Sequence, residues 1–88
     1  MPTNPEIIQH AREVHDQLGK TRPSPDRQPA VDDLRKSLGN VIDQPSHEPH
    51  YRTLADTLFR ERVELELEHP HLTESIERLA NALAQIGL

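Results

Sequence analysis

Apolar residues along the chain recur at alternating spacings of three and four, which is the period of an amphipathic helix. The pattern predicts four helices, at about residues 5–18, 30–42, 50–68 and 71–86. In chain order the four apolar stripes are Ile7, Ala11, Val14 and Leu18; Val31, Leu34, Leu38 and Val41; Tyr51, Leu54, Ala55, Leu58, Phe59, Val63 and Leu65; and Leu72, Ile76, Leu79, Leu83 and Ile86. We place the seven residues of the third stripe on one broad face. The prediction is a single all-α domain over residues 1–88.

Capping and breaking residues mark the ends of these helices. Asn4 followed by Pro5 predicts a helix start, because Asn can accept from a free amide and Pro fits the first turn. Residues 19–29 contain one glycine and three prolines, so they predict a Pro-rich linker, which we expect to be mobile together with the N-terminus. Ser46 is a candidate cap for the third helix. The second helix is continued through Gly39, at a cost of about 1 kcal/mol relative to Ala.

The segment from Glu66 to Leu72 predicts a corner between the last two helices. His69 at a helix end can bond the last carbonyls and interact with the negative end of the dipole. Glu66, three residues earlier, is placed to pair with it, and Pro70 disfavours helical geometry at His69 while fitting the start of a new helix. Two arrangements stay open: a hairpin turn within one chain, or a kink in one long helix that pairs with a second chain.

The small apolar content predicts association. Apolar residues make up 33% of the 88 residues, with one Phe, one Tyr and no Trp, and so small a domain buries a limited core. We therefore expect a small helical bundle or hairpin that is completed by dimerisation. The predicted interface residues are Leu58, Phe59, Arg62, Leu72, Ile76, Leu79, Leu83 and Ile86. Arg62 and Glu66 fall within an apolar arc, where they either reach water at its edge or fix the register of a helix–helix contact.

Charge and composition exclude several classes of protein. The formal net charge of −5 and the lack of a basic patch argue against nucleic-acid binding. The absence of cysteine removes disulfides and thiolate chemistry and fits a reducing cytoplasm. No run reaches the roughly 20 apolar residues of a membrane span, and nothing resembles a signal peptide. No catalytic motif is present, so we expect neither an enzyme nor a cofactor.

Six histidines invite a metal hypothesis. The pairs His47/His50 and His69/His71 flank a predicted helix of about 19 residues, which separates them by roughly 28 Å. One chain cannot bring both pairs to the same ion, and no local cluster supplies the four ligands that zinc prefers. We predict no metal site.

The C-terminal third resembles a known family of small bacterial proteins. The segment runs from Leu65-Glu66 through His69-Pro70-x-Leu72 to Leu83-Ala84-x-Ile86-Gly87-Leu88. It is similar to the domain of unknown function numbered forty-four-zero-four, although Leu65 takes the place of an aromatic residue and Gln85 that of Asn. The resemblance implies a helical protein and no activity, substrate or cofactor.

These observations favour a self-associating protein–protein interaction module in the cytoplasm, a homo-oligomer such as a dimer with a further, unknown protein partner. Two alternatives stay open: a metal-responsive protein that uses its histidines, and an acidic partner or inhibitor of a basic protein.

Overall fold

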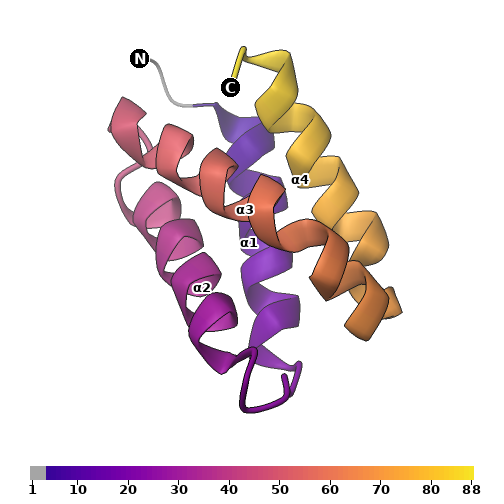
Figure 1. The fold of residues 1–88 in the computed structure, drawn as a ribbon. Coiled ribbons are helices and arrows are strands. Elements are labelled where there is room, and N and C mark those ends of the chain that lie inside the picture. Colours follow the sequence, from indigo (N-terminus) through magenta and orange to yellow (C-terminus); the bar gives the residue numbers. More distant parts are fainter. Residues whose placement is uncertain (1–3) are drawn as a thin grey trace.

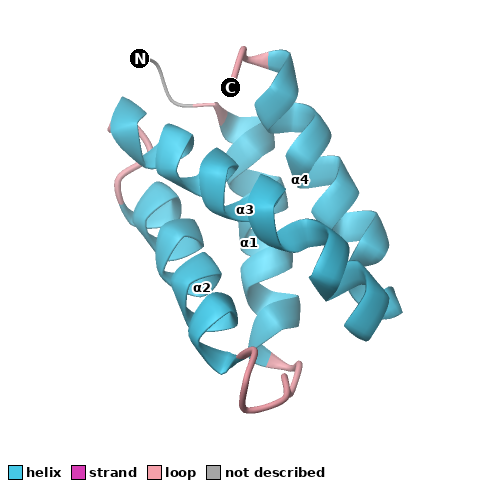
Figure 2. Ribbon diagram, in the orientation of Figure 1, coloured by secondary structure: helices cyan, strands magenta, loops and turns pink. Residues whose placement is uncertain are grey.

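A computed structural model describes residues 4–88 and consists of four helices. They are α1 (Pro5–Gly19), α2 (Gln28–Asp43), α3 (Glu48–Glu68) and α4 (Thr73–Gln85), with a short 3-10 turn, η1 (Pro70–Leu72), before α4 (Figure 2). No strand occurs within this range. The all-α prediction is confirmed, and each predicted helix bound lies within two residues of the observed one. The expectation of a mobile N-terminus falls on residues 1–3, which lie outside the described range.

The helices form an antiparallel bundle in which successive helices run in opposite directions (Figure 1). α1 contacts α2 and α4, and α3 contacts α2 and α4, so α1 and α3 lie diagonally across the bundle. α3 and α4 pack against each other after a turn at Pro70. Of the two arrangements left open by the sequence, the structure has the hairpin.

One core runs through the bundle. Its buried apolar residues are Ile7, Ala11, Val14, Leu18, Val31, Leu34, Leu38, Val41, Tyr51, Leu54, Ala55, Leu58, Leu65, Leu72, Ile76, Leu79, Ala80, Ala82 and Leu83. The Cα radius of gyration is 11.9 Å, close to the roughly 12 Å expected for a compact domain of this length. A single chain therefore encloses its core without a second copy.

Local interactions explain where α1 begins and where α4 ends. The Ile7 amide donates to the Asn4 side-chain oxygen at 3.1 Å, as the capping prediction required. After α4, Gly87 has φ 89°, and the amides of Gly87 and Leu88 donate to the carbonyls of Ala84 and Leu83. This is the Schellman arrangement, which needs a left-handed residue and so favours glycine.

Two details of the predicted boundaries are settled by the structure. α2 continues through Gly39. α3 has His47 and not Ser46 at its N-cap position, with Pro49 in its first turn, so the prediction of Ser46 as the capping residue was wrong.

The structure divides the predicted broad apolar face of α3 into a buried part and an exposed part. Leu54, Leu58 and Leu65 are buried, but the side chains of Phe59 and Val63 are exposed. They lie about 100° and 140° around the helix from Leu58. An apolar arc this wide cannot be covered by α2 and α4 alone, and its outer part is left at the surface.

Candidate interaction surface

The exposed apolar residues of α3 form one stripe. Phe59, Val63 and Leu67 are 37%, 60% and 73% exposed, and they are the large apolar residues that the structure leaves exposed between residues 4 and 88. Their spacing of four places them in one oblique row on the helix. We call this row the outer stripe of α3.

Charged residues flank the outer stripe on both sides. Arg60 and Glu64 lie about 60° and 100° to one side of Val63, and Glu66 and Arg62 lie about 60° and 100° to the other. On each flank the arginine precedes the glutamate by four residues. Between Phe59 and Leu67 the positive charges beside the stripe therefore lie in its N-terminal half and the negative charges in its C-terminal half, and Asp56 adds an exposed negative charge one turn before Phe59.

The flank that faces α4 contains a cluster of ionisable groups. Arg62 Nη1 lies 3.5 Å from Glu77 Oε2 of α4, and the Arg62 guanidinium lies 5.9 Å from the centre of the Phe59 ring. Burial and a hydrogen bond with Glu77 raise the pKa of Glu66, while the Arg62 charge opposes that rise. One arginine, Arg62, therefore lies beside two carboxyl groups, so this cluster has one positive charge for two acidic groups.

Two shallow hollows lie along this flank. The first, of about 300 Å³, is lined by Phe59, Arg62, Ala80, Asn81 and Ala84. The second, of about 370 Å³, is lined by Arg62, Val63, Glu66, Leu67 and Glu77. The outer stripe and the adjoining surface of α4 therefore present an apolar row beside a grooved surface, which suits an elongated partner such as a helix.

The structure separates the eight predicted interface residues into two groups. Leu58, Leu72, Ile76, Leu79 and Leu83 are fully buried in the chain's own core, and Ile86 is partly buried against it. Phe59 and Arg62 reach the surface, at the outer stripe and its flank. A contact with another molecule can use only the second group without unfolding the bundle.

The predicted corner lies between α3 and η1. His69 follows the last residue of α3, its amide donates to the Leu65 carbonyl at 2.8 Å, and Pro70 opens η1. The expected pairing of Glu66 with His69 was wrong. Glu66 instead interacts with Glu77 of α4, which raises its pKa, and His69 Nε2 is buried without a hydrogen-bond partner among the described residues.

Contacts at the same end of the bundle hold the α1–α2 connection against this corner. Arg27 Nη2 donates to Glu61 Oε2 at 2.8 Å and Arg27 Nε to Glu68 Oε1 at 3.0 Å. Thr21 Oγ1 lies 3.1 Å from His71 Nε2. The Pro-rich connection is therefore tied to α3 and η1 by specific bonds.

Glu61 is the centre of this polar contact. Burial alone raises its pKa, but hydrogen bonds from Arg60 and Arg27 outweigh burial and hold the pKa below its ordinary value. The ionised carboxylate is thereby the favoured form. The arrangement acts as a structural clamp between the connection and α3.

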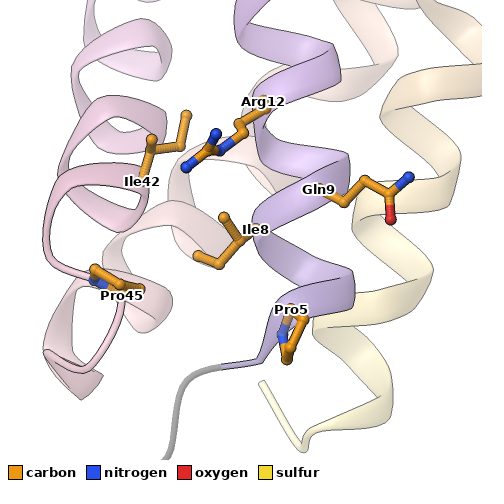
Figure 3. A pocket seen from close by; sticks show the side chains of 6 residues that line it. All are labelled: Pro5, Ile8, Gln9, Arg12, Ile42 and Pro45. Atoms are coloured by element: carbon orange, nitrogen blue, oxygen red, sulfur yellow. The ribbon is translucent and has the colours of Figure 1, made fainter.

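A second groove lies between α1 and α2, on the other side of the bundle (Figure 3). It measures about 470 Å³, and its lining residues are Pro5, Ile8, Gln9, Arg12, Ile42 and Pro45. The Arg12 side chain extends over the apolar wall formed by Ile8 and Ile42. It is an open apolar depression with a cation at one end.

The histidines remain in separate places. The His47 and His50 rings are 4.3 Å apart and those of His69 and His71 are 6.0 Å apart. Among residues 4–88 no group of three or more His, Cys, Asp or Glu side chains is arranged to hold a metal ion. Nor does any helix within that range combine the length and apolar character needed to cross a bilayer.

The outer stripe could have been found from the sequence, but two of its residues were missed. The prediction places Val63 in the third stripe but not among the interface residues, and it places Leu67 in no stripe, although the spacing 59, 63, 67 is present in the sequence. Arg27, Glu61 and Glu77 gave no such signal, because their contacts join segments that are distant in sequence.

Comparison with known proteins gives one family match. The family described as Domain of unknown function (DUF4404) matches residues 7–88. Searches of curated proteins and of solved structures return no match.

Proposed function

The chain belongs to the DUF4404 family, whose match extends over residues 7–88, and we propose that it is a cytoplasmic protein–protein interaction module that self-associates through the outer stripe of α3. One observation carries the proposal: a closed bundle leaves its large exposed apolar residues in a single row. A contiguous apolar patch rimmed by polar groups is typical of a protein contact surface.

The occupant that we propose is the same stripe of a second copy. Each apolar side chain would be covered by a chemically matched one, and both charge signs needed for pairing are present on the flanks. An isologous contact uses the same patch twice and closes after two copies. The contact would add no activity of its own and would make a dimer.

The test is sedimentation velocity or light scattering of the full chain from low to high micromolar concentration. We expect a reversible monomer–dimer equilibrium, and Val63→Glu should weaken it at least about tenfold because it buries a charge at the contact. Gln9→Glu is the matched control, since it adds the same charge on α1, diagonally across the bundle from α3. A wild-type monomer at tens of micromolar, with both variants identical to it, would overturn the proposal.

A further inference from the structure

From the order of charges along α3 we infer that two copies pair antiparallel, centred on Val63, with the stripe of one copy laid along the stripe of the other. This inference rests on the proposed self-association and specifies its geometry. In the sequence Arg60-Glu61-Arg62-Val63-Glu64-Leu65-Glu66, each outward arginine before Val63 has an outward glutamate after it. The surface is thus electrostatically self-complementary in only one direction.

The geometry of a twofold contact decides the direction. In antiparallel packing the same flank of both copies meets, with its N-terminal half against the C-terminal half of the other copy. Arg60 then lies beside Glu64 of the second copy, and Arg62 beside Glu66, each pair offset by about 3 Å along the axis. In parallel packing opposite flanks meet at similar heights, which brings Arg60 beside Arg62 and Glu64 beside Glu66. Like charges placed together oppose association.

The apolar row fits the same arrangement. Rows of residues four apart pack along each other when two helices cross at about −50°. An antiparallel pair crossing this way places Phe59 near Leu67 of the second copy and Val63 near its own equivalent. The largest and the most exposed side chains of the stripe would then cover each other.

The ionisable cluster on the α4 side is consistent with this pairing. The carboxyl groups of Glu66 and Glu77 interact with each other and share the single cation of Arg62, whose Nη1 lies 3.5 Å from Glu77 Oε2. Antiparallel pairing would bring Arg62 of the second copy to this end of the surface. Each Glu66 would then lie beside two arginines, its own Arg62 and that of the second copy.

Disulfide trapping tests the direction, because the chain contains no cysteine. Phe59→Cys and Leu67→Cys proteins are prepared separately, mixed and oxidised in a glutathione buffer. We expect the mixed 59–67 disulfide to exceed its statistical share, since a disulfide needs Cα atoms within about 7 Å and residues 59 of two antiparallel copies lie farther apart. A Gln9→Cys protein, whose cysteine lies on α1 outside the proposed contact, measures how much disulfide forms by random collision.

Charge exchange tests the flanks. Arg60→Glu with Arg62→Glu makes both flanks negative, and Glu64→Arg with Glu66→Arg makes both positive. Each double variant alone should self-associate at least about tenfold more weakly than wild type, and a mixture of the two should form a heterodimer. Circular dichroism of each variant verifies that the bundle is folded, and any variant that unfolds is replaced by its Arg60 or Glu64 single substitution.

The outcomes separate the two proposals. A monomeric wild type overturns self-association and this inference with it. A dimer that Val63→Glu weakens, but that yields 59–59 disulfides or an unaffected charge-reversed dimer, overturns the antiparallel geometry while the self-association stands. A stripe that binds only a different protein overturns both.

Discussion

α3 and α4 are neighbouring antiparallel helices whose apolar residues differ in how fully they are buried. In α4 the large apolar residues lie on one face, and Ile76, Leu79 and Leu83 are completely buried. In α3 a buried inner row and the exposed outer stripe lie on different sides of the helix. The helical period is present in both, so periodicity predicts the helix and the number of covering neighbours decides which apolar side remains at the surface.

The largest expected difference between the two faces concerns truncation of apolar side chains. Leu79→Ala should lower the free energy of unfolding by about 2–5 kcal/mol, because it leaves a cavity in a core that is fully enclosed. Val63→Ala at the outer stripe should change it by no more than about 0.5 kcal/mol under monomeric conditions. Urea unfolding followed by circular dichroism at low micromolar concentration measures both. Equal losses would contradict the assignment of inner and outer faces.

A smaller loss in the free energy of unfolding is expected at Glu61, where α3 contacts the α1–α2 connection. Glu61→Gln should destabilise the bundle by less than Leu79→Ala, because it removes the acceptor charge of the Arg27 clamp. The pKa of Glu61 is lowered in the folded chain, so its contribution is present above the unfolded value of about 4.5 and is lost as pH falls through the folded value. The difference between variant and wild type should therefore be largest near pH 7 and vanish in strong acid. A constant difference across pH would refute the ionised clamp.

The buried part of α3 also contains the hydroxyl group of Tyr51. Tyr51 donates to the Pro45 carbonyl at 2.5 Å, and its ring is fully buried. Tyr51→Phe keeps the ring and should cost about 1 kcal/mol, the usual net value of one such bond. Thr53→Ala is the control, since its exposed hydroxyl bonds a carbonyl of its own helix. Thermal unfolding of the two variants should differ, and matching melting temperatures would count against a structural role for the tyrosine hydroxyl.

The sequence predicted the helices well because their signals are local. The Asn4 cap, the Pro70 corner and the α4 stripe each depend on residues within a few positions of one another. Burial on α3 depends instead on where α2 and α4 pack, which no spacing within α3 encodes. The predicted dimer contact through Leu72 and Leu79 illustrates this, because both residues are buried in the chain's own core.

The candidate surface was predictable only in part for the same reason. Phe59 and Arg62 belonged to the predicted interface, whereas the pairing of Arg62 with Glu77 joins two helices and has no local pattern. Glu66 was expected to pair with the neighbouring His69, but it interacts with Glu77, eleven positions away, which raises its pKa. Sequence neighbours were favoured in the prediction because only sequence distance was visible.

The smallest expected effect lies at this outer cluster, where Glu66→Gln should act in opposite directions on folding and association. The pKa of Glu66 is raised in the folded chain, so its favourable contribution is present below the unfolded value of about 4.5 and is lost as pH rises through the folded value. Glutamine mimics the protonated acid, and under monomeric conditions the substitution should raise the free energy of unfolding by a few tenths of a kcal/mol near pH 7, with no gain in acid.

In the proposed dimer the same variant removes the acceptor for Arg62 of the second copy, so sedimentation should detect weaker association. Glu13→Gln is the control, because Glu13 lies on α1, which does not contact α3, and it also accepts a hydrogen bond from an arginine, Arg78. If Glu66→Gln instead destabilised the monomer and left association unchanged, the carboxyl pair would belong to the bundle alone and the contact with a second copy would have to lie elsewhere.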